Sequence, residues 1–128
     1  MTPRRILVAE DDPVTRRFVV TLLTRESFEV REAEDGESAW TQMESWRPDL
    51  VVTDVVMPYL DGFDLLRRAK SNATLRDIPI VVLSMKDREE DIVAGLEAGA
   101  EDYIVKPFHA RELVVRIQKI LARIGGGR

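Results

Sequence analysis

Short apolar runs recur along the chain and are separated by longer stretches of mixed character. The runs occupy residues 6–9, 28–33, 50–53, 80–83 and 103–105. The first, third and fourth are almost continuously apolar, which is typical of parallel strands that are covered on both faces. In the second run Val30 lies between Glu29 and Arg31, and this alternation indicates an edge strand. We therefore predict five strands, with the second at an edge of the sheet.

The stretches that follow the runs have the period of amphipathic helices. Their repeating apolar positions are Val14, Phe18 and Leu22; Ala39, Met43 and Trp46; Phe63, Leu66 and Ala69; Ile92, Leu96 and Ala100; and Leu113, Ile117, Ile120, Leu121 and Ile124. Arg16, Arg17 and Arg25 fall on other faces of the first helix. Pro13 marks the start of that helix, because the first turn does not need the N–H that proline lacks.

Repeated strand–helix units favour an α/β protein with a flavodoxin-like (βα)5 architecture, a three-layer sandwich with a parallel five-stranded sheet in the middle. Right-handed crossovers favour the strand order 2-1-3-4-5. A length of 128 residues suits one domain. We assign residues 1–124 to that domain and residues 125–128, Gly-Gly-Gly-Arg, to a flexible tail or the start of a linker.

Composition narrows the classes of protein. Charged residues make up 33% of the chain, and the net charge is −4. This near balance argues against disorder and against a dominant nucleic-acid-binding surface. The absence of cysteine excludes disulfides, thiolate metal sites and cysteine nucleophiles. No apolar run has the length of a secretory signal or a membrane span, so we expect a soluble cytoplasmic protein without membrane contact.

Chemically reactive side chains stand where the predicted strands end. Glu10 and Asp11 follow the first strand, Asp54 the third, Ser84 the fourth and Lys106 the fifth. In sheets of this kind, ligands bind at the carboxyl ends of the strands, near the point where the strand order reverses. We therefore expect one end of the sheet to collect several carboxylates, a hydroxyl and an ammonium group.

Such a cluster favours Mg²⁺-assisted phosphoryl transfer. Carboxylates that are held close together raise one another's pKa unless a cation joins them, and oxygen ligands favour Mg²⁺ before Ca²⁺. An aspartate in this setting can act as a nucleophile and form an aspartyl phosphate. The transfer needs mainly positioning and positive charge, which Mg²⁺, Lys106 and the Ser84 hydroxyl can supply.

Four segments carry a resemblance that covers nearly the whole chain. They are residues 6–13 (Ile-Leu-Val-Ala-Glu-Asp-Asp-Pro), 49–62 with Asp-Val-Val-Met-Pro inside, 78–84, and 99–108 (Gly-Ala-Glu-Asp-Tyr-Ile-Val-Lys-Pro-Phe). In order and spacing they resemble the signature blocks of the receiver domains of two-component response regulators, in the superfamily of the chemotaxis regulators. One block alone is a weak signal, and the four together are a strong one.

The resemblance implies a role for each matching residue. Asp54 matches the phosphoacceptor, which takes a phosphoryl group from a sensor histidine kinase or a histidine phosphotransfer protein. Asp11 and Asp54 match direct ligands of Mg²⁺, for which Mn²⁺ is a substitute. Glu10 matches a metal ligand that acts through water, and the backbone carbonyl of Val56 matches a further ligand.

The resemblance also implies a switch. Lys106 matches the lysine that pairs with the phosphoryl group, and its bond to Pro107 is cis in the family. Ser84 matches the hydroxyl that follows the phosphoryl group on activation, and Tyr103 matches the aromatic residue that then turns inward. Such a domain is a signalling switch rather than an enzyme, and it catalyses only its own Mg²⁺-dependent phosphorylation and dephosphorylation.

The implied output lies on the fourth helix, fifth strand and fifth helix. This face would control dimerisation, a partner protein or an output domain, without direct nucleic-acid contact. Residues 87–117 are similar to the dimerising receivers of winged-helix transcription regulators, which points to a homodimer through the same face.

Three positions near the expected site differ from the family pattern or vary within the family. Met85 stands where the family usually has alanine or glycine, and its bulk would narrow access to Asp54 or restrict Tyr103. Val56 has no polar group to orient an attacking water, and Lys86 can hold a phosphate oxygen. These features predict a long-lived phosphoryl state.

Simpler interpretations remain for single residues. Asp11 and Asp12 can cap the first helix, Ser84 can cap the fourth, and His109 is expected at the surface. Two other functions also remain. A hydrolase with an aspartyl-phosphate intermediate would need a second acid at the position of Val56. A pseudo-receiver would bind partners without phosphorylation.

Overall fold

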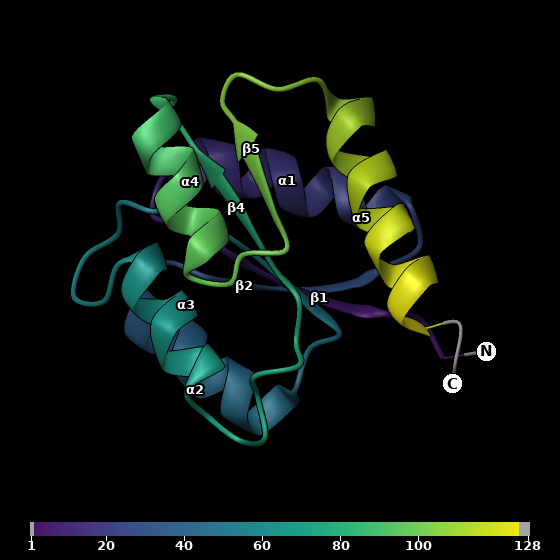
Figure 1. The fold of residues 1–128 in the computed structure, drawn as a ribbon. Helices are drawn as coiled ribbons and strands as arrows, with labels where there is room; N and C mark the ends of the chain where they lie inside the picture. Colours follow the sequence, from purple (N-terminus) through teal and green to yellow (C-terminus); the bar gives the residue numbers. More distant parts are fainter. Residues whose placement is uncertain (1, 126–128) are drawn as a thin grey trace.

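Five parallel strands in the order β2-β1-β3-β4-β5 form the centre of the structure (Figure 1). The computed structural model describes residues 2–125. Along the chain the elements are β1 (Arg5–Ala9), α1 (Pro13–Arg25), β2 (Glu29–Ala33), α2 (Gly36–Trp46), β3 (Leu50–Thr53), α3 (Gly62–Lys70), β4 (Ile80–Ser84), α4 (Glu89–Glu97), β5 (Asp102–Val105) and α5 (Ala110–Gly125). The predicted flavodoxin-like fold and its strand order are confirmed.

The sheet buries side chains on both faces, because alternate residues of a strand point to opposite sides. In β1, Ile6 and Val8 belong to the core that α1 and α5 cover, whereas Leu7 and Ala9 belong to the core beneath α2, α3 and α4. Figure 1 shows these two groups of helices on opposite sides of the sheet. All residues of β3 and β4 are buried, whereas β2 lies at the edge and is largely exposed. The continuous and alternating apolar patterns therefore identified central and edge strands correctly.

Each of the first three helices is capped by an aspartate that immediately precedes it. Asp12, Asp35 and Asp61 accept hydrogen bonds from the backbone N–H groups of the residues three positions later, at 2.9, 2.7 and 2.8 Å. Such a cap satisfies a donor that has no partner inside the helix. Asp12 is thereby committed to capping α1, and Pro13 is the first residue of that helix, as predicted.

The prediction of the buried face of α1 was wrong. Val14 and Phe18 are 77% and 50% exposed, and the residues that α1 buries are Val19 and Leu23. Apolar side chains on this helix span two neighbouring stripes, and their period alone does not decide which stripe docks on the sheet. Phe18 instead meets Phe108, with ring centroids 6.0 Å apart. Leu96 of α4, predicted as a core position, is likewise 45% exposed.

The loop that follows β3 is held by close backbone packing. A Cβ atom at Gly36 would lie 1.8 Å from the carbonyl oxygen of Leu60, and one at Gly62 would lie 2.0 Å from the carbonyl oxygen of Asp54. A side chain at either position would force this loop to move. The first residues of α2 and α3 therefore set where the loop from 54 to 61 lies.

The carboxyl-terminal boundary differs slightly from the prediction. Residue 125, which was assigned to a flexible tail, is the last residue of α5. Residues 126–128, the rest of that predicted tail, lie outside the described residues. Within the described part of the chain, the helices are too short or too polar to span a membrane.

Candidate functional site

The predicted site residues meet where four neighbouring strands end. Glu10 follows β1, Asp54 follows β3 and Lys106 follows β5, whereas Ser84 is the last residue of β4. Because these strands are adjacent in the sheet, their carboxyl ends lie side by side. Glu10 and Ser84 are buried, and the side chains of Asp54 and Lys106 keep only a small exposed fraction.

Lys106 connects the ends of β1 and β3. Its Nζ atom lies 2.6 Å from Oε1 of Glu10 and 3.0 Å from Oδ2 of Asp54. The other oxygen of Asp54, Oδ1, accepts a hydrogen bond of 2.6 Å from the backbone N–H of Val55. Charge-assisted hydrogen bonds are short and directional, so they hold the Asp54 carboxylate in one orientation. The peptide bond from Lys106 to Pro107 is cis, as the resemblance implied.

One ammonium group thus serves two carboxylates. The pKa of Glu10 is raised from 4.5 to about 7. Burial is the largest cause, the hydrogen bond from Lys106 opposes it, and the negative charge of Asp54 raises the pKa further. Burial alone would lower the pKa of Lys106, but its hydrogen bonds to Glu10 and Asp54 outweigh burial and raise it. The site therefore lacks positive charge even with Lys106 in place.

Three carboxylates converge in a cluster that could hold a cation. Glu10, Asp11 and Asp54 each offer an oxygen, and these oxygens lie within 4.8 Å of one another. Asp11 is exposed, so the cluster is open to solvent on that side. Mg²⁺ binds oxygen ligands and keeps several of its waters, and an open side leaves room for them. The donor set therefore fits Mg²⁺ or Mn²⁺.

A hollow of about 220 Å³ lies beside Asp54. Its lining residues are Asp54, Val56, Ser84, Met85 and Lys86. Val56 and Met85 are 60% and 76% exposed, so they form an apolar rim. Met85 was expected to narrow access to Asp54, and the structure places it in the wall of this hollow.

Ser84 and Tyr103 both hold the backbone of Lys86. The hydroxyl oxygen of Ser84 accepts a hydrogen bond of 3.1 Å from the N–H of Lys86, and the hydroxyl of Tyr103 donates a 2.8 Å bond to the Lys86 carbonyl. Tyr103 is buried, so its ring already lies inward in this structure. The Ser84 hydroxyl and the predicted switch aromatic are therefore linked through the backbone of one residue of the β4–α4 loop.

Gly95 of α4 makes room for the inward ring of Tyr103. A Cβ atom at Gly95 would lie 2.9 Å from Cδ2 of Tyr103 and 3.3 Å from Cε1 of Phe63. Real Cβ atoms essentially never come within 3.0 Å of such an atom, so a side chain at Gly95 would displace the ring of Tyr103 or the helix. Gly95 was not predicted from the sequence, because a glycine inside a helix has no signature of its own.

The structure distinguishes among the simpler interpretations of single residues, namely helix capping by Asp12 or Ser84 and a surface position for His109. Asp12 caps α1, and the hydrogen bonds that it accepts from Thr15 lower its pKa. The capping alternative for Ser84 is wrong, because α4 begins after Arg88, which makes no side-chain capping bond. His109 is exposed, as expected.

Arg16 is a site neighbour that the sequence analysis missed. Its Nη1 atom donates a hydrogen bond of 2.8 Å to the carbonyl oxygen of Glu10. It was placed on a face away from the core, because the apolar stripe of α1 was assigned one residue out of step. With Val19 and Leu23 as the buried positions, the helical period puts Arg16 on the same face, which is the signal that identifies it.

Replacing Glu10 with glutamine should stabilise the metal-free protein at neutral and alkaline pH. A carboxyl whose folded-state pKa lies above its unfolded value contributes stability below about pH 4.5, and this contribution is lost as the pH rises through 7. In EDTA at pH 8 we expect E10Q to raise the free energy of unfolding by roughly 1–3 kcal/mol. Urea unfolding at several pH values measures this difference, which should shrink toward pH 5. E44Q, at an exposed position, is the control, and an E10Q protein less stable than the parent at pH 8 would contradict the prediction.

Comparison with known proteins identifies the family. Residues 6–118 match the family described as Response regulator receiver domain. The chain is 45% identical over 121 residues to the phosphate regulon transcriptional regulatory protein PhoB of Klebsiella pneumoniae, covering 94% of this chain and 53% of that protein. It is 43% identical over 121 residues to the response regulator MprA of Mycolicibacterium vanbaalenii, covering 94% and 52%. The chain thus spans about half the length of these relatives.

Solved structures agree with the sequence comparison. A putative response regulator from Chloroflexus aurantiacus superposes with a TM-score of 0.90 at 36% identity, over 94% of this chain and 99% of that one. The chemotaxis response regulator CheY4 of Vibrio cholerae superposes with a TM-score of 0.87 at 28% identity, over 94% and 100%. With the family match over most of the chain and the acidic cluster and lysine at the ends of its strands, this chain belongs to the response regulator receiver domains of two-component signal transduction.

Proposed function

We propose that this chain is a phosphorylation-activated switch. It accepts a phosphoryl group on Asp54 from a sensor histidine kinase or a histidine phosphotransfer protein. The observation that carries this proposal is the position of Lys106, whose ammonium contacts Asp54 at the edge of an open hollow. Residues 1–124 form the receiver unit in this proposal.

The chemistry is an in-line transfer to a carboxylate oxygen. An oxygen of Asp54 forms a bond to phosphorus while the bond from phosphorus to the donor nitrogen breaks, and the donor histidine leaves with the electron pair of that bond. Lys106 stays within reach of the Asp54 carboxylate and supplies positive charge to the incoming group. Glu10 shares the same ammonium, so it keeps Lys106 at this end of the sheet.

The metal ligands follow from the acidic cluster. Asp11, Asp54 and the backbone carbonyl of Val56 would hold Mg²⁺ or Mn²⁺ directly, and Glu10 would contact it through water. A bound divalent cation supplies positive charge that neutralises the phosphoryl oxygens during transfer. The three convergent carboxylate oxygens and the missing positive charge of the site support this assignment.

Phosphorylation would act on the link between Ser84 and Tyr103. The modification adds about −1.5 to −2 charges at neutral pH, and Ser84 lines the hollow beside Asp54 where those oxygens would stand. When that hydroxyl turns to the phosphoryl group, Lys86 loses one of its two backbone anchors. The β4–α4 loop then rearranges with Tyr103, which biases a two-state element by a local charge.

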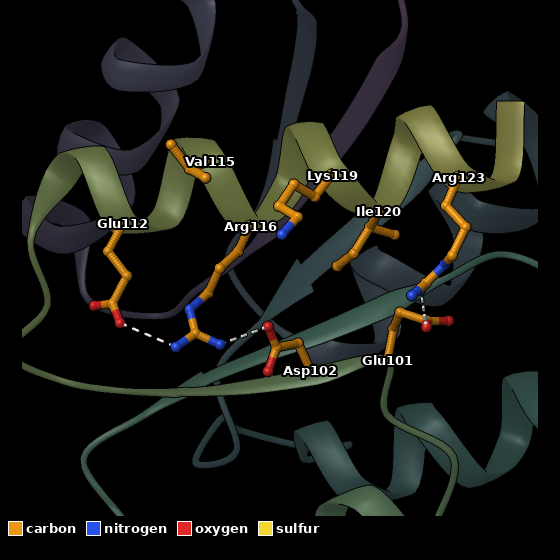
Figure 2. A pocket seen from close by; sticks show the side chains of 8 residues that line it. All are labelled: Glu101, Asp102, Glu112, Val115, Arg116, Lys119, Ile120 and Arg123. Carbon is orange, nitrogen blue, oxygen red and sulfur yellow. Dashed lines mark hydrogen bonds and ion pairs between the residues drawn. The ribbon is translucent and has the colours of Figure 1, made fainter. Parts of the chain in front are cut away.

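The output face lies on α4, β5 and α5. Figure 2 shows a hollow between α5 and β5, with Arg116 reaching both Asp102 and Glu112 and with Arg123 paired with Glu101. The hollow has a volume of about 550 Å³. Exposed ion pairs stabilise a monomer very little, so the same groups can exchange partners across a second copy. This face is our proposed site of dimerisation, or of contact with a partner or an output domain.

Incubation with acetyl phosphate and Mg²⁺ should add one phosphoryl group to the protein. Intact mass spectrometry measures the gain, which should require Mg²⁺ and disappear in D54N. D12N is the matched control, because Asp12 is an acid of the same region that caps α1, and it should still be phosphorylated. No gain in the parent protein would contradict the proposal unless M85A restores it; failure of M85A as well would favour the pseudo-receiver alternative.

The phosphoryl group should survive for minutes or longer once the donor is removed. Val56 and Lys86 line the hollow beside Asp54, and neither side chain carries an oxygen that could accept a hydrogen bond from an attacking water. We expect V56N to shorten the half-life, read by intact mass after desalting, by about tenfold. V93N, a change at an exposed valine of α4, is the control and should leave the half-life unchanged. Loss within seconds in the parent protein would contradict this expectation.

Phosphorylation should also drive dimerisation through the face of α4, β5 and α5. Light scattering of the acetyl-phosphate-treated protein should show a dimer that D54N does not form. R116E should weaken that dimer while the intact mass still shows phosphorylation, because Arg116 is exposed and remote from Asp54. R17E on the exposed side of α1 is the control. A phosphorylated monomer, or an R116E dimer of unchanged strength, would remove dimerisation from the proposal.

A further inference from the structure

Arg16 contacts the loop that carries two of the three clustered acids. Its Nη1 atom lies 2.8 Å from the carbonyl oxygen of Glu10 and 3.5 Å from that of Asp11. The Nε atom donates a hydrogen bond of 2.9 Å to Oε1 of Glu32 on β2. A single guanidinium therefore ties the end of β1 to the neighbouring strand.

The surroundings of Arg16 distinguish it from an ordinary surface arginine. Its side chain is 16% exposed, whereas its partner Glu32 is 45% exposed. The adjacent Arg17 is exposed. A guanidinium presents its donors in a rigid plane, so the bond to Glu32 also fixes the direction in which Nη1 points.

The loop is held from both sides. The N–H of Glu10 donates a 3.0 Å hydrogen bond to the carbonyl of Ala33 on β2, and the carbonyl of Glu10 accepts the bond from Arg16. With both of its backbone polar groups engaged, the peptide frame of Glu10 has little freedom. The side chains of Glu10 and Asp11 leave this frame toward the cluster.

We infer that Arg16 is a positioning residue for the divalent-cation site. It acts through the backbone carbonyls of the loop and does not touch the cation. Mg²⁺ demands near-ideal octahedral geometry, and partners that orient metal ligands are typically worth 10–100-fold in metal affinity. The inference rests on the proposed function, because it takes Glu10 and Asp11 as ligands of that cation.

The sign of the effect separates positioning from simple electrostatics. Arg16 is a cation beside a site that binds a cation, so its charge by itself opposes Mg²⁺ binding. If charge were its only contribution, removing Arg16 would tighten Mg²⁺ binding. A positioning role requires the opposite result.

Calorimetric titration of the full chain with Mg²⁺ alone tests the inference. We expect R16A to weaken Mg²⁺ binding by about tenfold or more, and R16K, which can reach one carbonyl but cannot form the fork, to recover part of that loss. E32Q should fall between R16A and the parent protein, because it loosens the Nε anchor and leaves the guanidinium. R17A is the matched control and should bind within about twofold of the parent.

A second readout excludes a merely structural role. The Mg²⁺ concentration that half-saturates phosphorylation by acetyl phosphate should rise by the same factor in R16A, while the rate at saturating Mg²⁺ stays close to that of the parent. A general loss of structure would lower the saturated rate and the melting temperature in EDTA, and would not shift the Mg²⁺ midpoint selectively.

Several outcomes would overturn the inference. Unchanged or tighter Mg²⁺ binding by R16A would do so, as would an equal loss in R17A. If R16A does not fold, the Mg²⁺ affinities of R16K and E32Q test the inference instead. Affinities equal to that of the parent protein in both variants would exclude a positioning role for Arg16. If the parent protein binds no Mg²⁺, both the proposed metal site and this inference are wrong. If the parent protein and R16A bind Mg²⁺ with the same affinity, only the inference is wrong.

Discussion

The ammonium group of Lys106 between the carboxylates of Glu10 and Asp54 is the interaction on which the site depends. Three charged groups from the ends of three strands are withdrawn from most of the solvent, and buried charges are tolerated only when they are paired and hydrogen-bonded. The pairing leaves one negative charge in excess, and Asp11 adds a second. A site of this charge favours a divalent cation, and it disfavours any rearrangement that takes Lys106 away from both acids.

Each layer of the fold supports that arrangement. Parallel pairing places the ends of β1, β3 and β5 at the same end of the sheet, and burial on both faces fixes their register. Aspartate caps begin α1 and α3 directly after the loops that carry Asp11 and Asp54. Gly36 and Gly62 let helix and loop backbones approach so closely that the loop after β3 has little room to shift. The site is therefore rigid in its backbone, and its freedom lies in side chains and in the β4–α4 loop.

The sequence was sufficient for the sheet and for the strand ends that meet in it, because both follow from strong periodic signals. The roles of the residues at those ends stay predictions. Continuous apolar runs mark strands that are buried on both faces, and the order of strands then dictates which ends meet. The orientation of α1 could not be predicted from the sequence. Val14 and Phe18 are as apolar as Val19 and Leu23, and only the packing of the helix on the sheet determines which pair is buried. The link from Ser84 to Tyr103 could not be predicted from the sequence either. This link runs through the backbone of Lys86, and the Lys86 side chain takes no part. Arg16 was missed because its place beside the site follows only once the buried face of α1 is known.

Two features of helix α4 lower its local stability, namely its single buried residue and its missing side-chain cap. Among residues 89–97, all of which the structure describes, the one buried position is Gly95, and the N-cap residue Arg88 makes no side-chain capping bond. A glycine inside a helix lowers its intrinsic stability by about 1 kcal/mol, and a missing cap costs a similar amount. The small residue that admits the ring of Tyr103 therefore also lowers the local stability of α4, and elements of low stability are those that open locally in a native protein. A rearrangement of α4 would thus reshape one face of the domain at little energetic cost, without loosening the core around Glu10, Asp54 and Lys106.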